Sequence, residues 1–132
     1  MLVLDASLIV EWCVAPGERK LAELLSDDLC APPLMWSEAI SALHERTWRR
    51  ELDADEADLA RTRLTDVGVT PKTHSGLADE AWRFADELGW AKTYDAEYVA
   101  LASLLKCRLV TVDGRLRRGA DRLGFVLGPT EL

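Results

Sequence analysis

Two aspartates stand at the ends of short apolar runs, and this position suits cation binding. Asp5 follows Leu2-Val3-Leu4, and Asp113 follows Val110-Thr111-Val112. Such runs are typical of buried parallel strands, and open parallel sheets bind ligands beyond the carboxyl ends of their strands. Two carboxylates that meet there repel each other unless they share a proton or hold a cation. Mg²⁺ suits the site because it prefers carboxylate oxygens and keeps several of its waters.

Two further carboxylates have both a structural and a functional interpretation. Asp95 lies where a helix is expected to begin, so it either caps that helix or contributes to the site, with Thr93 as the alternative cap. Glu38 follows two prolines in the expected first turn of another helix, where a carboxylate complements the helix dipole. Its helical face also carries Ser41, Ala42 and Glu45, the pattern of a solvated surface. Periodicity alone assigns neither residue to a site.

Short apolar strands alternate with helices along the whole chain. Strands are expected over residues 2–4, 29–31, 69–71, 109–112 and 125–127. Helices are expected over residues 7–12, 18–25, from the prolines to about 50, from Asp53 to about 68, 77–88, and from near Asp95 to 105. Asp53 and Glu56 resemble a capping box. This alternation predicts an α/β fold, a three-layer α/β/α sandwich around a central, mainly parallel sheet.

Two of these helices show an apolar face in the sequence. The helix after the prolines places Trp36, Ile40, Leu43 and Thr47 on one stripe. The helix near Asp95 does the same with Tyr98, Leu101, Ala102 and Leu105. These stripes are the expected contacts with the rest of the fold.

Composition indicates one globular domain over residues 1–132. Apolar residues make up 48% and charged residues 30%, which is not the composition of a disordered chain. No apolar run approaches the roughly 20 residues of a membrane helix, and Asp5 and Glu11 interrupt the first apolar stretch, so neither a membrane span nor a signal peptide is expected. The net charge of −7 argues against holding nucleic acid by bulk positive charge, but not against handling it through a metal.

The cysteines indicate a cytoplasmic protein with reduced thiols. Cys13, Cys30 and Cys107 are odd in number and widely spaced. His44 and His74 stand alone, so the spacing of a zinc site is missing. A catalytic Cys–His pair stays open, because such partners meet in space rather than in sequence.

Four short motifs occur in order along the chain: Leu4-Asp5-Ala6-Ser7, residues 33–38 (PLMWSE), residues 94–102 (YDAEYVALA) and residues 110–116 (VTVDGRL). Together they resemble PIN-domain ribonucleases, most closely the toxin component of VapBC toxin–antitoxin pairs. The resemblance extends from Asp5 to the last strand. It implies that the chain is a single PIN-like nuclease domain.

The resemblance also implies the members of an acidic site. Asp5, Glu38, Asp95 and Asp113 would form it, with Asp5 as anchor ligand, Asp95 and Asp113 completing the coordination of Mg²⁺ or Mn²⁺, and Glu38 holding a water on the metal or a second ion. Ser7 would orient Asp5 or contact phosphate, and Thr111 would support the ligands. Gly114-Arg115-Leu116 stands where many relatives carry another acidic residue. One bound ion in the free protein, and a second arriving with substrate, is therefore expected.

The implied activity is metal-dependent hydrolysis of RNA phosphodiester bonds, with tRNA or rRNA as substrate. The implied partners are a cognate antitoxin and a second copy of the chain. Arg115, just after Asp113, is expected to contact phosphate together with Arg117, Arg118 and Arg122. Arg46, Arg49 and Arg50 fit either phosphate contact or the dipole of the helix they close, and Lys92 is a weaker phosphate candidate.

Five tryptophans, Trp12, Trp36, Trp48, Trp82 and Trp90, favour packing in a core or an interface over base stacking.

Two other functions remain open. The first is a non-catalytic acidic binding module whose carboxylates are only caps and surface groups. The second is a receiver-like phosphoacceptor domain. That domain would need paired acids after the first strand, where Ala6-Ser7 stands here, and a lysine after the last one.

Overall fold

Five short parallel strands form one sheet at the centre of the molecule. The computed structural model describes all residues from 1 to 132. The strands are β1 (Leu2–Leu4), β2 (Leu29–Ala31), β3 (Thr70–Pro71), β4 (Arg108–Val110) and β5 (Val126–Leu127), in the spatial order β3-β2-β1-β4-β5. In the register, Leu2 pairs with Leu29 on one side and with Arg108 on the other. β1 is therefore the central strand.

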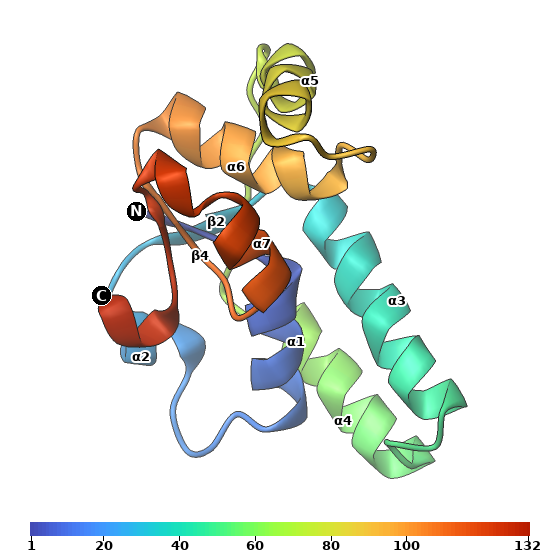
Figure 1. Ribbon diagram of the computed structural model, residues 1–132. Coiled ribbons are helices and arrows are strands. Elements are labelled where there is room, and N and C mark those ends of the chain that lie inside the picture. The colour runs from blue at the N-terminus through green and yellow to red at the C-terminus, as the bar shows by residue number, and fades with distance from the viewer.

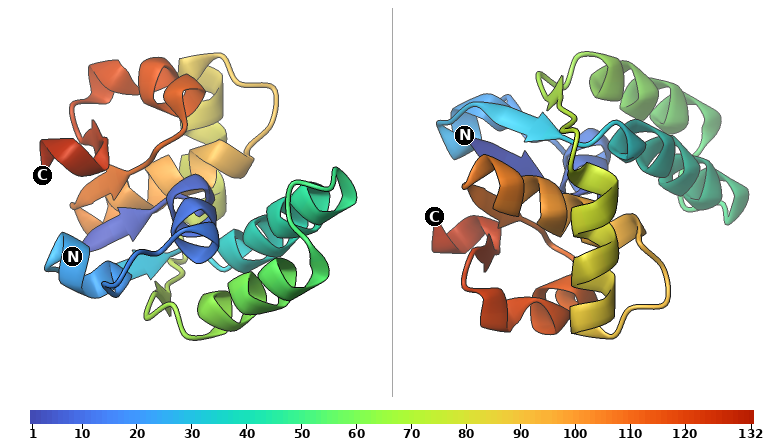
Figure 2. Two further views of the ribbon diagram at one scale, coloured as in Figure 1. Left: turned by 90° about the horizontal axis from the view of Figure 1, so that it is seen from below. Right: turned by 90° about the horizontal axis from the view of Figure 1, so that it is seen from above.

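Helices cover both faces of this sheet, as expected for a three-layer sandwich. They are α1 (Ala6–Val14), α2 (Leu21–Leu25), α3 (Leu34–Trp48), α4 (Ala54–Thr65), α5 (Leu77–Leu88), α6 (Tyr94–Leu105) and α7 (Gly114–Gly119), with short 3₁₀ turns at Asp121–Leu123 and Pro129–Glu131. α6 packs on β1 and β4, and α5 packs on α6. On the other side α1 contacts α3 and α4 (Figures 1 and 2).

The order of connections places a switch point beside β1. From β1 the chain moves outward to β2 and then to β3, and it returns through α5 and α6 to β4 on the opposite side of β1. In open α/β sheets the crevice at such a reversal, outside the carboxyl ends of the strands, is where ligands bind. Asp5 directly follows β1, and Asp113 lies just beyond β4. Both expected site aspartates thus lie at this crevice.

The apolar face of α3 differs from the expected one. The helix buries Met35, Ala39 and Leu43, whereas Ile40 is 46% exposed. The buried side of α3, which faces α1 and α4, is rotated about the helix axis relative to the expected stripe through Trp36 and Ile40. The neighbouring helices determine this rotation. In α6, by contrast, the buried residues include Tyr98, Leu101 and Ala102, as expected.

Several boundaries also differ from the sequence expectation. The last two strands are shorter, and the second helix begins only at Leu21. α7, directly after Asp113, was not anticipated, because six residues with two glycines carry almost no helical periodicity. The capping box of Asp53 and Glu56 is confirmed, with each side chain bonded to the other's backbone N–H.

The tryptophans divide into two groups. Trp12, Trp36 and Trp90 are partly buried and pack against the core, which agrees with the packing interpretation. Trp48 and Trp82 are exposed. None of the helices combines the length and the apolar character that crossing a membrane requires.

Candidate metal centre

Asp5 is the most buried carboxylate of the protein, with 4% of its surface exposed. Its backbone N–H donates to the carbonyl oxygen of Val110 at 3.0 Å, which continues the pairing of β1 with β4. Its Oδ2 accepts hydrogen bonds from Ser7 Oγ at 2.5 Å and from Thr111 Oγ1 at 2.8 Å. Strand pairing and these two hydroxyls fix the position of the carboxylate.

Thr111 joins the ends of the two central strands. While its hydroxyl donates to Asp5, the same oxygen accepts the backbone N–H of Asp113 at 3.0 Å. Ser7 Oγ lies 3.3 Å from Thr111 Oγ1 and accepts the backbone N–H of Val112 at 3.4 Å. Ser7 and Thr111 therefore both support the carboxylate of Asp5 through hydrogen bonds.

Asp113 is the N-cap of α7. Its Oδ1 accepts the backbone N–H groups of Arg115 at 2.9 Å and of Leu116 at 3.3 Å, which are free donors at the start of a helix. Oδ2 takes no part in the cap. The carboxylate is thus oriented by one oxygen, and the other oxygen is left for a ligand.

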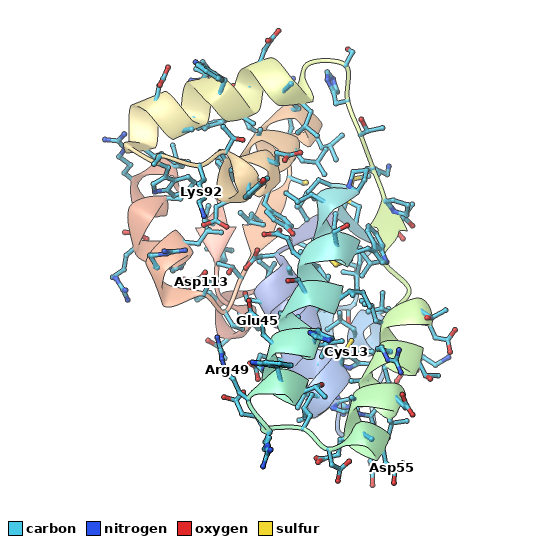
Figure 3. All side chains as sticks on the ribbon, turned by 90° about the vertical axis from the view of Figure 1, so that its right-hand side faces the viewer. Cys13, Glu45, Arg49, Asp55, Lys92 and Asp113 are labelled. Carbon is cyan, nitrogen blue, oxygen red and sulfur yellow. The ribbon has the colours of Figure 1, made fainter.

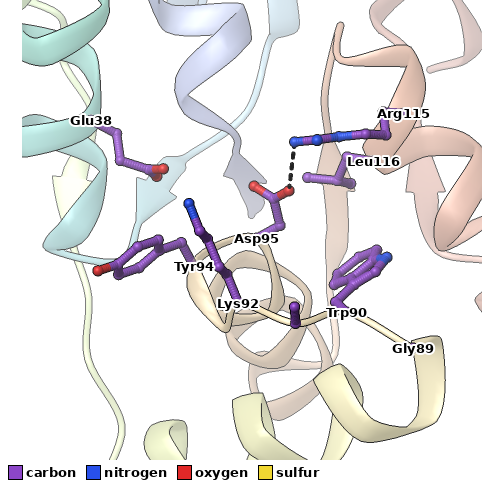
Figure 4. A pocket seen from close by; sticks show the side chains of 9 residues that line it. Glu38, Gly89, Trp90, Lys92, Tyr94, Asp95, Arg115 and Leu116 are labelled. Carbon is purple, nitrogen blue, oxygen red and sulfur yellow. Dashed lines mark ion pairs between the residues drawn. The ribbon is translucent and has the colours of Figure 1, made fainter.

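Asp95 is not a helix cap. α6 begins at Tyr94, Thr93 occupies the N-cap position, and no side chain caps this helix. As the second residue of α6, Asp95 lies near the positive end of the helix dipole. Its Oδ2 lies 3.8 Å from Nη2 of Arg115 (Figure 4). Of the two alternatives, the structure shows the one in which Thr93 occupies the N-cap position, so the carboxylate of Asp95 is not used to cap α6.

Glu38 lies one turn further along α3 than expected, beyond the free N–H groups of the helix start. It is half-buried rather than part of a solvated face, and the hydroxyl of Tyr98 donates a short hydrogen bond to its Oε1. Tyr98 itself has 0% of its surface exposed. Sequence reasoning placed Tyr98 only in the apolar stripe of α6, although it is the one polar member of that stripe.

The pKa values of Asp5, Glu38 and Asp95 are all raised. Burial raises the pKa of Asp5, and hydrogen bonds from Ser7 and Thr111 partly oppose this shift. Burial is also the main cause of the raised pKa of Glu38 and of Asp95, and the negative charges of neighbouring carboxylates add to both shifts. The site therefore concentrates negative charge where water solvates it poorly, and a cation would relieve that cost.

A pocket of about 490 Å³ opens beside these carboxylates. Glu38, Asp95 and Arg115 line it (Figure 4). The other lining residues are Leu116 and, around the connection from α5 to α6, Gly89, Trp90, Ala91, Lys92 and Tyr94. The ammonium group of Lys92 points toward Glu38 and Asp95 in this view. Lys92 and Asp113 also face the same side of the molecule, whereas Asp55 lies at the far end of α4 (Figure 3).

The donor set fits Mg²⁺, although the side chains do not form a finished ligand cage. No three of the His, Cys, Asp and Glu side chains converge on a common metal position as they are oriented here. Mg²⁺ is commonly held by one or two carboxylates while it keeps several of its waters, so a cage of three direct ligands is not required. Asp5, Asp113, Asp95 and Glu38 could hold such an ion, since the charges of neighbouring carboxylates act on Asp5, Asp95 and Glu38.

Most of the other candidate arginines form ion pairs or hydrogen bonds within the protein. Of the group after Asp113, only Arg115 lines the pocket. Arg117 pairs with Asp121 and Glu131, and Arg122 donates to the carbonyl oxygen of Glu87. On α3, Arg46 pairs with Glu11, and Arg49 pairs with Glu45 at 3.3 Å.

The thiols show no sign of activation. Burial raises the pKa of Cys13 to about 11, and it also raises the pKa of Cys30 and Cys107. All three cysteines are free, and none bonds to a histidine. A catalytic Cys–His pair is not formed.

Comparison with known proteins assigns the family. The PIN domain model matches residues 2–122. The chain belongs to the PIN-domain family. This PIN domain is 34% identical over 116 residues to "Ribonuclease VapC9" of Mycobacterium tuberculosis and to "VapC ribonuclease Mb0985" of Mycobacterium bovis, in each case covering 88% of both chains.

A solved structure supports the fold of this PIN domain. The crystal structure of PAE2754 from Pyrobaculum aerophilum superposes with a TM-score of 0.75, covering 98% of this chain and 91% of that one at 24% identity. The resemblance seen in the four motifs is confirmed at the level of the family. The receiver-like alternative does not fit a PIN domain that extends from β1 to beyond α7.

Proposed function

We propose that this protein is a Mg²⁺-dependent endoribonuclease and the toxin of a toxin–antitoxin pair. The observation that carries the proposal is the placement of Asp5 and Asp113 at the switch point of the sheet, joined through Thr111 and faced by Asp95 and Glu38. The relatives named VapC ribonuclease support the class of reaction.

Three aspartates would hold the metal ion. Asp5 is the rigid anchor for the ion, because strand pairing and two hydroxyls hold it. Asp113 offers the oxygen that does not cap α7, and Asp95 offers a carboxylate at the start of α6. When bound, Mg²⁺ lowers the pKa of water and neutralises charge that develops on the phosphoryl oxygens; Mn²⁺ can replace it.

Glu38 and Arg115 act on the substrate side. Glu38, held by Tyr98, would help to hold the ion through one of its waters, and it orients the attacking water and accepts its proton. The water oxygen forms a bond to phosphorus while the bond from phosphorus to the ribose oxygen breaks, and a proton from solvent neutralises that leaving oxygen. Arg115, which pairs weakly with Asp95, turns to the phosphate when RNA enters.

The substrate class and partners follow from the same family. We infer that the RNA is a tRNA or an rRNA, that a cognate antitoxin restrains the enzyme, and that the protein works as a homodimer in the cytoplasm. With a net charge of −7, the protein has little bulk attraction for RNA, so the metal and a few cations supply the local recognition.

The test is cleavage of RNA by the purified protein, followed by sequencing of the new 5′ ends. Mg²⁺ or Mn²⁺ should support cleavage, chelation should stop it, and Asp5→Asn or Asp95→Asn should abolish it. Asp55→Asn is the matched control, because it makes the same change at the far end of α4 (Figure 3). Cleavage by Asp5→Asn at the parent's rate would show that the site is wrong. A parent that cuts no RNA with either metal would leave the non-catalytic binding module as the better description.

A further inference from the structure

The pocket beside the carboxylates contains two aromatic side chains that the proposed chemistry does not use. Trp90 and Tyr94 line it, and Figure 4 shows them on opposite sides of Lys92. We propose that this pocket binds single-stranded RNA with the two nucleotides that flank the cleaved phosphate splayed apart, one base on Trp90 and the other on Tyr94. The inference rests on the proposed ribonuclease function and names the form of RNA that the site accepts.

Trp90 is held in place from two directions. Its backbone N–H donates to the carbonyl oxygen of Ala85 at 2.8 Å, and its indole packs partly against the core. A Cβ atom at Gly119 of α7 would lie 3.0 Å from Cζ2 and 3.1 Å from Nε1 of Trp90, so only glycine lets α7 come this close. A ring that is already positioned loses little conformational entropy when a base stacks on it.

Tyr94 supplies the second aromatic surface. It is the first residue of α6, it is exposed, and it directly precedes Asp95. An aromatic ring therefore lies one residue from a carboxylate of the candidate metal centre. Stacking on such rings tolerates any base, because every base has a π-face.

The charges of the pocket suit the phosphate between the two bases. Lys92 lies between the aromatic side chains, and Arg115 lies beside Asp95. Cations placed among carboxylates can position the phosphate without giving sequence specificity. Bases that occupy opposite sides of Lys92 cannot stack on each other. A base-paired duplex is therefore excluded, and a single strand or a loop is required.

The first test removes bases and aromatic rings in combination. The RNA is a single-stranded oligonucleotide around the mapped cleavage site, with an abasic residue on the 5′ or the 3′ side of the cleaved phosphate. Each abasic residue, and each of Trp90→Leu and Tyr94→Leu, should lower kcat/KM about tenfold on its own. Trp90→Leu should then be insensitive to one abasic position and Tyr94→Leu to the other, because partners of one contact do not add.

Two further variants separate stacking from folding. Gly119→Ala displaces the indole without removing it and should lower kcat/KM only for RNA that keeps the base bound at Trp90. Trp82→Leu removes an exposed tryptophan of α5, outside the pocket, and should keep the parent's kcat/KM. The proposal would be overturned if each Leu substitution lowered kcat/KM by its full factor with both abasic RNAs. It would also be overturned if the protein cleaved the same sequence equally fast within a duplex.

A second measurement needs no cleavage. A short oligouridylate with one central 2-aminopurine should lose fluorescence when it binds the Glu38→Gln protein with Mg²⁺ present, because stacking quenches this base and Asp5, Asp95 and Asp113 stay in place to hold the ion. The quenching should fall in the same protein carrying Trp90→Leu and Tyr94→Leu. Quenching without any RNA cleavage by the parent would overturn only the proposed function. If the parent cleaves RNA but the quenching is unchanged by Trp90→Leu and Tyr94→Leu, only the stacking pocket would be overturned.

Discussion

Thr111 donates its hydroxyl to the carboxylate of Asp5 at 2.8 Å and accepts the backbone N–H of Asp113 through the same oxygen. One buried hydroxyl thus ties the aspartate at the end of β1 to the aspartate beyond β4. This oxygen therefore links the carboxylate of Asp5 to the backbone of Asp113. Support of this kind orients metal ligands in proteins, and its loss typically costs 10- to 100-fold in metal affinity or activity.

Thr111→Val keeps the shape of the side chain and removes the hydroxyl. We expect RNA cleavage to fall by about 10- to 100-fold. The free energy of unfolding should fall by about 2 kcal/mol, because the buried carboxylate of Asp5 loses one donor and the part-buried N–H of Asp113 loses its acceptor. Thr111→Ser retains the hydroxyl and should recover most of the activity. Equal activity of the Val and Ser variants in matched Mg²⁺ would contradict this role.

Asp5→Asn should make the protein more stable while it abolishes cleavage. Burial raises the pKa of Asp5 in the folded state, so the charged form costs stability, and this cost develops as pH rises from the unfolded pKa through the folded pKa. The asparagine oxygen can still accept from Ser7 and Thr111. Denaturant unfolding at neutral pH should show a gain on the order of 1 kcal/mol.

The pH dependence supplies the control for this prediction. Below the pKa of the carboxyl group Asp5 is protonated in both states, so the advantage of Asp5→Asn should shrink as the pH falls. A gain of the same size at acidic and neutral pH would show that charge is not its cause.

Tyr98→Phe should weaken the binding of Mg²⁺ without unfolding the protein. The change removes the hydroxyl that donates to Glu38 and leaves the buried ring in place. We expect the Mg²⁺ concentration for half-maximal cleavage to rise by about tenfold, at the lower end of what lost support of a site costs. The Mg²⁺-dependent rise in Tm, titrated in parallel, should move to higher concentration by the same factor.

Thr62→Ala is the control for Tyr98→Phe. It also removes one hydroxyl hydrogen bond, here to the carbonyl oxygen of Asp58 on α4, outside the site. It should leave both Mg²⁺ titrations at their parental midpoints. A Tyr98→Phe protein with parental midpoints would show that Glu38 needs no support from Tyr98.

Arg115→Ala should weaken RNA binding and leave stability unchanged. The side chain of Arg115 is 83% exposed and lies 3.8 Å from Asp95, so this ion pair contributes little to folding. We expect KM to rise by about tenfold and the dependence of log KM on log salt to lose about 0.7 in slope, the value for one contact to a single strand. Arg49→Ala, which breaks an exposed ion pair on α3, should change neither quantity. An unchanged salt slope in Arg115→Ala would exclude a phosphate contact.

Local patterns in the sequence were sufficient for most of the elements, although not for α7, and for the strand-end positions of two aspartates. Apolar runs that end in Asp5 and Asp113 predicted two strands with a carboxylate at each carboxyl end, and Asp53 with Glu56 predicted the start of α4. These features depend on neighbours within a few residues, so the chain encodes them locally. The four motifs predicted the family, which the PIN domain match confirms. The roles of the site residues stay predictions.

Tertiary structure decided the relationships between distant residues. The strand order puts β1 between β2 and β4, and only this order brings Asp5 beside Thr111, 106 positions later. The rotation of α3 about its axis, set by packing against α1 and α4, turned Ile40 outward and carried Glu38 to Tyr98, 60 positions away. Periodicity states that a helix has an apolar face, but the neighbours that cover the helix determine which residues that face contains. For the same reason the pocket with Trp90 and Tyr94 appears only after α7 has packed against the segment that leads into α6.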